Sequence, residues 1–428
     1  MAVKLKKLVS ALATVGLSGA LLTGMWAAAP ADAAGKTRVT VWLMAGGPDF
    51  EKVMNNAIEE FEKSNPNIDV EHQFIPWPGV DEKVASALAS GTNPDVMEMG
   101  NTRLPPYVAM GALASLEPFL KGSPLAREIT QAQWEVSGGL HDGQRYAVPF
   151  IQATRPLFYN RAIFREAGLD PDVSPSTWEQ WLEAASKTHN PRRGISGLSI
   201  GGNDNIPLPF LWFGPLLWQA GGQILTPDNR KAAFNSKEGV EALSFLVELV
   251  EYAQPGFLGM RNADADQLFY QGRAATTTMP SNSLIRIPAQ YPKLDFGIGL
   301  TQRKQKATSA GMDSLVMFST AKDKQAAWKV IEWLTGARAQ AAIAKVSGFT
   351  PVLESLVTSP EFAEDKRWSV VFETMQYMRA LPMLPVWARI QPRMGEEIHY
   401  ALAGKKTPQE ALDAAAEFAN AQLETAGK

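Results

Sequence analysis

The 428-residue sequence predicts an α/β fold with more than one domain, on three observations. Strand-like and helix-like runs alternate between residues 38 and 103, the order expected of a parallel sheet with helices on its faces. The same alternation begins again near residue 175. Between the two parts lies a turn followed by an extended run that a proline interrupts, and the length allows two or three domains.

The first part contains three predicted strands and two predicted helices. Apolar residues from Phe50 to Phe61 recur at helical spacing and so share one face of a helix. The other elements are strands at 38–44, 68–74 and 96–99 and a helix at 80–90. Because ligands of parallel sheets bind beyond the carboxyl ends of the strands, we expect ligand loops at 44–49 and 100–103.

The segment from Asp142 to Asn160 joins the two parts. It opens on Asp142-Gly143, a tight-turn pair, and continues as an extended apolar run. Pro149 lies in the middle of this run, where it would remove a hydrogen-bond donor from a central strand. A proline there favours a strand end or a crossing between lobes, so we interpret the segment as a hinge strand.

The second part also predicts alternating helices and strands, but its sequence patterns are weaker. Ser176 and Glu179 stand at capping-box spacing, and Thr407 and Glu410 repeat that pattern before the last helix. Between them the sequence predicts a strand at 197–200, a loop at 203–209, an aromatic-rich segment at 210–218, a helix at 236–252, a strand at 314–318 and helices at 322–334 and 337–345.

Composition excludes several classes of function. The formal net charge of −3 gives no indication of nucleic-acid or anionic-membrane binding. The chain has no cysteine, which excludes disulfides, cysteine nucleophiles and cysteine-ligated metal centres. Its four histidines show no metal-ligand spacing, and we predict neither a metal nor a cofactor.

The N-terminus predicts export. Three lysines within residues 4–7 precede an apolar run at 8–22, and Ala31-Asp32-Ala33 fits a cleavage site, which together indicate a signal peptide over residues 1–33. A membrane anchor is the alternative, but the run is shorter than the roughly 20 apolar residues that a span requires. Residues 22–25 resemble a lipobox, yet Met25 stands where the lipid-bearing cysteine belongs.

The joining segment resembles the lobe-crossing region of bacterial extracellular solute-binding proteins, the sugar-binding subunits of ABC importers, which reads roughly Asp/Asn-Gly-x-x-Tyr-x-Val-Pro and ends in Tyr-Asn. The resemblance covers nearly the whole chain after the signal peptide. It includes Val39–Trp42, Phe61–Pro66, Asn93–Val96, Gly111–Leu113, Gly221-Gly222, Phe234–Ser236 and Ala326–Leu334.

This resemblance implies an α/β, two-lobe periplasmic-binding-protein fold with hinge crossovers and a ligand cleft between the lobes. One lobe would comprise residues 37–148 plus 308–352, and the other 149–307 plus 353–428. It further implies a monomeric, exported protein, periplasmic or at the cell surface, that closes on a di- or oligosaccharide and offers it to ABC transporter permease subunits in the membrane. No catalytic role is expected.

A binder of glycerol-3-phosphate or its diesters is an alternative within the same class. The Gly46-Gly47 loop would suit a phosphate if its backbone amides converge. Arg155 or Arg389 could then pair with the phosphate.

The resemblance also implies a set of ligand-binding residues, chosen because sugars stack on aromatic rings and hydrogen-bond to short polar side chains. They are Trp42 and Asp49 in the first loop, Asn101, Thr102 and Arg103 in the second, Tyr159 at the end of the crossing, Trp212 or Trp218 in the aromatic segment, Asp313, and Trp387 and Arg389 late in the chain. For each tryptophan, burial in the core is the alternative.

Two of these residues need comment. Strand alternation puts Leu157 and Tyr159 on one face, so Leu157 would be core and Tyr159 would project at the mouth of the cleft. A core tyrosine is the alternative. After Gly311 many sugar binders carry tryptophan or asparagine, whereas this chain has Met312-Asp313, which leaves the identity of the sugar open.

A secreted serine hydrolase is the alternative from another class. Gly197-Leu198-Ser199-Ile200-Gly201 matches the G-x-S-x-G nucleophile elbow, and His399 lies downstream. That elbow requires a helix directly after the serine, whereas Gly202 and Asn203 follow here, so a glycine-flanked strand is the competing interpretation. The adjacent acids Glu59-Glu60 and Glu396-Glu397 diverge on their predicted helices, and we expect them on solvated faces.

Overall fold

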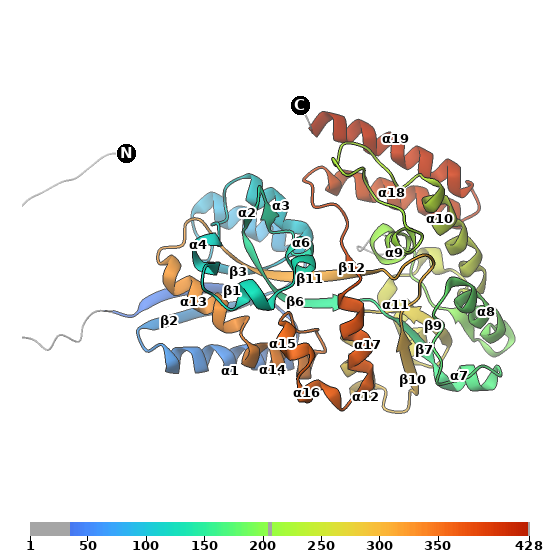
Figure 1. Ribbon diagram of the computed structural model, residues 1–428, viewed down its shortest axis with the longest axis horizontal. Helices are drawn as coiled ribbons and strands as arrows, with labels where there is room; N and C mark the ends of the chain where they lie inside the picture. The colour runs from blue at the N-terminus through green and yellow to red at the C-terminus, as the bar shows by residue number, and fades with distance from the viewer. Residues whose placement is uncertain (1–34, 204–207, 427–428) are drawn as a thin grey trace, which may run out of the picture. The chain divides into compact units, whose positions relative to one another are not determined.

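The computed structural model describes residues 35–203 and 208–426 (Figure 1). The predicted signal peptide and Met25 lie outside the described residues. Two main sheets organise the described part, one in each of two lobes, which confirms the predicted α/β, two-lobe fold.

The first sheet has six strands. They are β1 (Thr37–Met44), β2 (Ile68–Ile75), β3 (Val96–Gly100), β6 (Ala147–Thr154), β11 (Thr308–Met317) and β12 (Met378–Arg379), in the order β12-β11-β3-β1-β2 with β6 on the other edge of β11. Strand β1 pairs in parallel with β2 and β3, as the sequence predicts, and β11 runs antiparallel to β3 and β6.

The second sheet has four strands in the order β10-β7-β9-β8. These are β7 (Leu157–Asn160), β8 (Ser196–Leu198), β9 (Ala274–Thr278) and β10 (Phe296–Gly299). A small hairpin of β4 (Leu140–His141) and β5 (Gln144–Arg145) precedes the crossing. Its turn residues Asp142 and Gly143 both have positive φ, 49° and 72°, as the predicted tight turn requires.

Helices cover both sheets. They are α1 (Pro48–Ser64), α2 (Val80–Ser90), α3 (Leu104–Ala109), α4 (Glu117–Leu120), α5 (Leu125–Glu128), α6 (Gln131–Val136), α7 (Arg161–Glu166), α8 (Trp178–Thr188), α9 (Gly214–Gln219), α10 (Lys237–Leu249), α11 (Asn262–Tyr270), α12 (Ser283–Gln290), α13 (Lys324–Leu334), α14 (Ala337–Ser347), α15 (Glu354–Val357), α16 (Pro360–Ala363), α17 (Lys366–Met375), α18 (Trp387–Leu402) and α19 (Pro408–Ala426). Short 3-10 turns are η1 (Asn101–Arg103), η2 (Pro191–Arg193), η4 (Val250–Tyr252) and η5 (Phe257–Gly259), and η3 (Pro209–Phe213) is π-helical.

Successive side chains of β1 point to opposite faces of the first sheet, and both faces are covered by helices. Val41 and Leu43 pack in a large core with α1, α13 and α14, whereas Trp42 and Met44 pack on the opposite face with α2 and α3. The large core also includes Phe158 of the second sheet and side chains of α12 and α17. The two lobes therefore share a continuous apolar core on that side.

The chain changes sheet later than the position of Pro149 suggested. Strand β6 stays paired with β11 as far as Thr154, opposite Ala310, and only Arg155 and Pro156 separate it from β7. Pro149 is tolerated inside β6 because β6 lies on the edge of β11 beside a β-bulge, where Ser314 pairs with Pro149 and Asp313 with Ile151. The crossing thus lies beyond residue 148, the end expected for the first lobe's opening segment.

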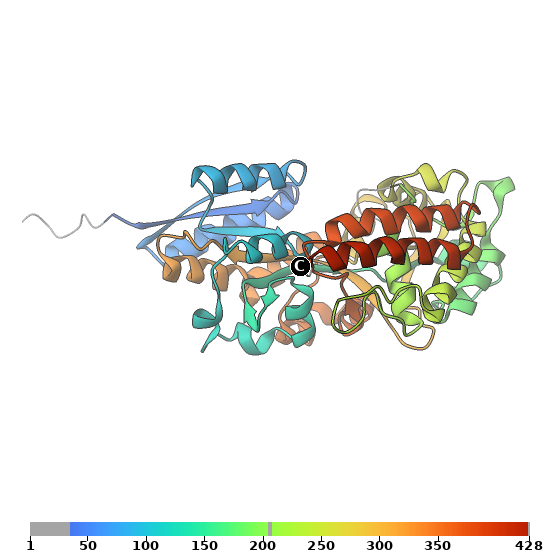
Figure 2. The ribbon, with the colours of Figure 1, turned by 90° about the horizontal axis from the view of Figure 1, so that it is seen from above.

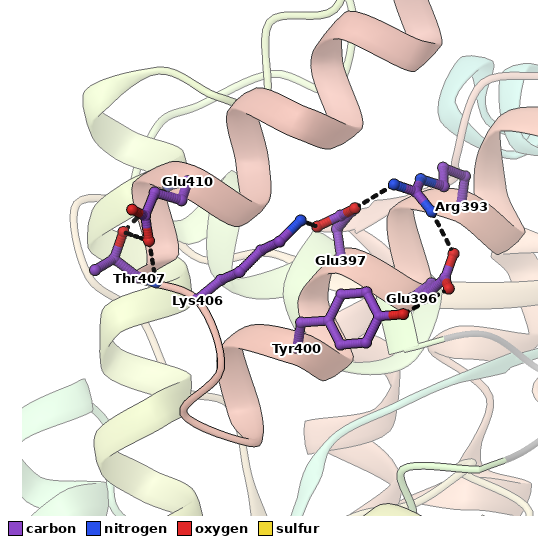
Figure 3. Close-up of polar contacts among 7 residues, drawn as sticks. All are labelled: Arg393, Glu396, Glu397, Tyr400, Lys406, Thr407 and Glu410. Carbon is purple, nitrogen blue, oxygen red and sulfur yellow. Dashed lines mark hydrogen bonds and ion pairs between the residues drawn. The ribbon is translucent and has the colours of Figure 1, made fainter.

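Helices α18 and α19 lie side by side, as Figure 2 shows, and an ion-pair network links α18 to Lys406 in the loop between the two helices. Glu397 is completely buried and accepts hydrogen bonds from Arg393 and Lys406, while its neighbour Glu396 is exposed and pairs with Arg393 and Tyr400 (Figure 3). The expectation that both acids lie on a solvated face is therefore wrong for Glu397. Its partner Lys406 lies in the loop after α18, a contact that the sequence pattern of one helix does not reveal.

Candidate functional site

Strand β11 extends past the end of β3, and the first two residues of the extension, Thr308 and Ser309, pair with β12. Pairing between β3 and β11 stops at Gly100 and Asp313, so residues 308–312 of β11 continue beyond the carboxyl end of β3. On the other side, β6 accompanies this extension as far as Thr154. The two strands form a ribbon at the edge of the sheet where parallel α/β proteins bind ligands.

Two small residues, Gly311 and Ala153, lie side by side on this ribbon, and we call them the floor. Gly311 of β11 pairs with Ala153 of β6, and both are accessible. A Cβ atom added to Gly311 would meet no atom within 4 Å, so the space above it is open. By strand alternation Ser309, Gly311 and Asp313 share one face. The Ser309 hydroxyl is buried and has no hydrogen-bond partner among the described residues.

Charged and aromatic side chains surround one end of the floor. Around the position that a Cβ on Gly100 would take, Asp313 Oδ1 lies at 3.3 Å, Arg103 Nη1 at 3.5 Å and Trp77 Cη2 at 3.6 Å. Arg103 Nε donates a hydrogen bond to Asp81 Oδ1 at 2.9 Å, and its guanidinium lies 5.3 Å from the centre of the Trp77 ring. Arg103 of η1, Asp81 of α2 and Trp77, which precedes α2, thus lie together near the end of β3.

Glu98 lies behind Asp313 and shares its environment. The Glu98 side chain is 1% exposed, and its Oε2 accepts the Met44 backbone N–H at 2.9 Å. Burial raises the pKa of Glu98 well above its usual value, and the nearby Asp313 carboxyl raises it further. Burial likewise raises the pKa of Asp313 to about 7, against the opposing effect of Arg103. The site therefore holds two acids that resist ionisation together.

The second lobe contributes a narrow cavity beside the crossing. Arg155, Trp212, Thr278 and Thr308 are among the residues that line it. Arg155 Nη2 donates to the Thr278 carbonyl at 2.7 Å, and the Thr308 hydroxyl donates to the Arg155 carbonyl at 2.9 Å. These bonds tie the crossing to β9 and to the first residue of β11.

Of the residues that the sequence singled out, the structure brings Arg103 and Asp313 together at this site. Asn101 is buried, and its amide donates to the Val136 carbonyl at 2.9 Å, which holds the loop. Thr102 is exposed on η1, Asp49 is exposed in the first turn of α1, and Arg389 is exposed in the first turn of α18.

The four tryptophans lie in the core, which is the alternative that the sequence left open. Trp42 packs with Met44 and Met97 under α2. Trp212, Trp218 and Trp387 belong to one cluster with α8, α10, α18 and α19, and each is less than 5% exposed. Trp212 also lines the cavity beside the crossing, where its Nε1 has no hydrogen-bond partner among the described residues.

The expected projection of Tyr159 from the cleft mouth is wrong. Its side chain is 2% exposed and packs against Phe164, with the ring centres 4.9 Å apart. The ring also covers Gly297 of the adjacent strand β10, where a Cβ would lie 2.3 Å from it. Strand β7 is buried on both faces, so alternation does not leave either face free for a ligand.

The Ser199 motif has a structural explanation. Ser199 is fully buried, its hydroxyl donates to the Ala265 carbonyl at 2.5 Å, and no helix follows it directly in the described residues. Neither Gly197 nor Gly201 leaves space for a side chain. A Cβ on Gly197 would lie 2.0 Å from the Ala185 carbonyl oxygen, and a Cβ on Gly201 would lie 2.4 Å from the Asn262 backbone nitrogen. This arrangement is a tightly packed strand and not a nucleophile elbow.

Sequence reasoning missed Glu98, Gly311 and Ala153. Glu98 carried a usable signal, because it is the one charged residue in the buried strand Val96–Gly100. Gly311 and Ala153 gave none, since their role depends on pairing between strands that are far apart in the sequence. Within the described ranges, no helix is long and apolar enough to span a membrane.

Known proteins of similar sequence and structure were then compared with the chain. The model of the family described as bacterial extracellular solute-binding protein matches residues 47–341. The sn-glycerol-3-phosphate-binding periplasmic protein UgpB of Escherichia coli is 25% identical over 420 residues, covering 92% of this chain and 94% of that protein.

Two solved structures resemble the whole described fold. An ABC transporter solute-binding protein from Thermotoga lettingae, bound with α-D-tagatose, has a TM-score of 0.79 and 29% identity and covers 91% of this chain and 100% of its own. The cyclic α-maltosyl-1,6-maltose binding protein from Arthrobacter globiformis has a TM-score of 0.80 and 27% identity, with the same coverage. With a family model that spans more than half of its length, the chain belongs to the bacterial extracellular solute-binding proteins.

Proposed function

We propose that this protein binds a di- or oligosaccharide between its lobes and delivers it to the permease of an ABC importer. The observation that carries the proposal is the accessible floor of Gly311 and Ala153, bordered by Asp313, Arg103 and Trp77. Small residues leave room for a sugar ring, and carboxyl and guanidinium groups bind hydroxyls. The sugar ligands named for the two similar structures support this class of ligand.

Closure of the lobes would use the side where they already share a core. The apolar cluster of α1, α13 and α14 continues into Phe158, α12 and α17, whereas the ribbon of β6 and β11 leaves the floor accessible. The crossings at residues 155–156 and 300–307 are short enough to serve as hinges. In the proposal the lobes keep the bounds 37–148 plus 308–352 and 149–307 plus 353–428, except that residues 149–154 of β6 belong to the first lobe.

The remaining parts of the proposal follow from the family. The protein would be exported to the periplasm or cell surface by the N-terminal signal, act as a monomer and have no catalytic activity. The UgpB relative favours a second candidate, binding of glycerol-3-phosphate or a glycerophosphodiester.

A thermal-shift screen of mono-, di- and oligosaccharides and glycerophosphodiesters tests the proposal. A ligand at 100 times its Kd should add about 2.7 kcal/mol to the stability of the folded protein. The expected result is stabilisation by a saccharide. Stabilisation by glycerol-3-phosphate alone would instead support the second candidate, and a response to neither class would contradict the proposal.

Substitution of the floor locates the site. Gly311→Leu should fold normally, because the space above Gly311 is open, and should weaken saccharide binding at least about tenfold by filling that space. Gly259→Leu is the matched control, since Gly259 is also exposed with no atom within 4 Å of a Cβ. Wild-type affinity in Gly311→Leu would show that the ligand binds elsewhere.

A further inference from the structure

An arginine beside the floor has no partner for its charge. Arg379 is the second residue of β12 and pairs in register with Ser309 of β11. Its side chain is partly accessible, and no hydrogen bond or ion pair joins it to any residue that the structure describes. Burial lowers the pKa of Arg379 below its ordinary value, and no nearby acid opposes this effect. Its guanidinium therefore has no counter-charge within the described chain.

The other arginines show that this arrangement is unusual within the described residues. Every other arginine that is partly buried there bonds an acid or a carbonyl oxygen, namely Arg103, Arg145, Arg155, Arg161, Arg367 and Arg393. A partly buried cation without such a bond lowers the stability of a fold, because it has lost water and gained no partner. Arg379 is thus better explained by binding than by folding.

The register of the strands places Arg379 on the face that carries the floor. Paired residues of neighbouring strands point to the same face, so Arg379 lies with Ser309 and, by alternation, with Gly311. The preceding residue, Met378, agrees with this, because it packs on the opposite face with Val136 of α6. None of the Arg379 nitrogens is fully buried, so the guanidinium is accessible to a group bound above the floor.

The nearby acids do not neutralise Arg379. Asp313 lies four residues along β11 from the register partner of Arg379, which is roughly 13 Å at the rise of a strand. The cation near Asp313 is Arg103. Glu373 of α17, the helix that precedes β12, bonds Lys306. The floor therefore has an unpaired cation at one end, and an acid with its own cation at the other.

The charge of the ligand decides what lobe closure costs at Arg379. A neutral saccharide would offer hydroxyl oxygens and, once the lobes close, would leave the guanidinium away from water with its charge unbalanced. An anionic group would supply both the oxygens and the opposite charge. A carboxylate or a phosphate also accepts two parallel hydrogen bonds from one guanidinium, which makes this pairing stronger than a bond to a hydroxyl.

We propose that Arg379 is a ligand-binding residue that pairs with an anionic oxygen group, a carboxylate or a phosphate, on the ligand. In a saccharide this group is the carboxylate of a uronic acid or the phosphate of a sugar phosphate. In the second candidate it is the phosphate of glycerol-3-phosphate. The inference rests on the proposed function for the position of the site, and it narrows the charge of the ligand.

Matched pairs of charged and neutral probes test the inference. A thermal-shift screen of the chain after residue 33 compares uronates and sugar phosphates with the corresponding neutral sugars, the digalacturonate disaccharide with its methyl ester, and glycerol-3-phosphate with glycerol. Calorimetric titration then measures the affinity of each pair that responds. We expect the charged form to bind at least about tenfold tighter than its neutral partner. The pair that shows this preference distinguishes a carboxylate from a phosphate.

Variants of Arg379 assign the preference to this residue. Arg379→Gln should weaken binding of the charged ligand at least about tenfold and abolish its preference over the neutral partner. Arg379→Lys keeps the charge but loses the planar fork, so its affinity should lie between those of the wild type and Arg379→Gln. Arg127→Gln is the matched control, since Arg127 of α5 is exposed and its side chain has no partner among the described residues. It should leave the affinity unchanged.

The stability of the free protein separates a binding role from a structural one. Because Arg379 is partly buried and unpaired within the described residues, Arg379→Gln should leave the thermal midpoint unchanged or raise it. A midpoint that falls by several degrees, with ligand affinity unchanged in the folded protein, would show a structural role and overturn the inference.

The remaining outcomes distinguish this inference from the proposed function. Equal affinity for the charged and neutral forms, or a preference that survives Arg379→Gln, would overturn the inference and leave saccharide binding intact. Binding of glycerol-3-phosphate alone, lost in Arg379→Gln, would support the inference and contradict saccharide binding. Binding of no probe in the screen would contradict both.

Discussion

Two buried glutamates, Glu397 and Glu98, have opposite surroundings. Glu397 of α18 is fully buried, and Arg393 and Lys406 both donate hydrogen bonds to its carboxylate. Glu98 is equally buried in β3 but faces a second carboxyl, Asp313, and receives one backbone N–H from Met44. The first arrangement neutralises a buried charge with two cations and fixes the loop after α18, whereas the second places two acids with raised pKa values beside the open floor.

The comparison indicates which acid has a structural role and which has a functional one. A buried carboxylate with two cations is satisfied without a ligand. Burial of Glu98 beside Asp313 raises the pKa of both acids and costs folding free energy. Strongly shifted pKa values of this kind are concentrated at functional sites.

Removal of Glu397 should be strongly destabilising. Glu397→Ala deletes both ion pairs and leaves a cavity between α18 and α19, so we expect a loss of roughly 3 kcal/mol or more in the free energy of unfolding. Urea denaturation measures it. Glu396→Gln is the matched control on the same helix, where an exposed pair contributes about 0.5 kcal/mol or less. Equal effects of the two variants would contradict the structural role of Glu397.

The stability of the wild type should fall as the pH rises from 4 to 7. In this window folded Asp313, with its pKa raised to about 7, still binds a proton that the unfolded chain has already lost. Folding therefore takes up a proton, and the slope of stability against pH is negative. We expect Asp313→Asn to remove a decline on the order of 2 kcal/mol. Parallel pH curves for the two proteins would show that Asp313 titrates normally.

Neutralising Glu98 should have a small effect of the opposite sign to that of Glu397. Glu98→Gln keeps an oxygen for the Met44 N–H and removes the conflict with Asp313. We expect a gain of about 1 kcal/mol at pH 8, where the cost of two adjacent acids is greatest. Denaturation at pH 5 and pH 8 checks it. A loss at pH 8 similar to that of Glu397→Ala would mean that the Glu98 carboxylate is structurally required.

The sequence predicted the strands and helices between residues 38 and 99 for physical reasons. Residues 38–99 alternate clearly because β1, β2 and β3 are parallel and covered by amphipathic helices, and the end of β3 follows directly from that order. Arg103, expected in the loop after this strand, lies near Asp313 at the end of β3, and its role in ligand binding remains a prediction. Asp313 was noticed through its departure from a family pattern, and the structure shows that it pairs across from Gly100.

Other predictions failed because they depended on contacts between distant segments. Tyr159 was expected at the cleft mouth and is buried, and Trp42 and Trp218, for which the sequence left cleft and core open, are buried in the core. Pro149 suggested a crossing, yet a β-bulge against β11 accommodates it inside the sheet. Glu98 and Glu397 each look like an ordinary charged residue until the opposing strand or helix is known.

The titration of Asp313 and Glu98 in the free protein tests the account most directly. Carboxyl-carbon NMR chemical shifts, followed from pH 3 to pH 9 and assigned with Asp313→Asn and Glu98→Gln, report the protonation of each acid. The account predicts that Asp313 titrates near pH 7, that Glu98 titrates well above the usual range for glutamate, and that a saccharide ligand shifts the Asp313 midpoint. Titration of both acids near pH 4, with no change on ligand binding, would contradict it.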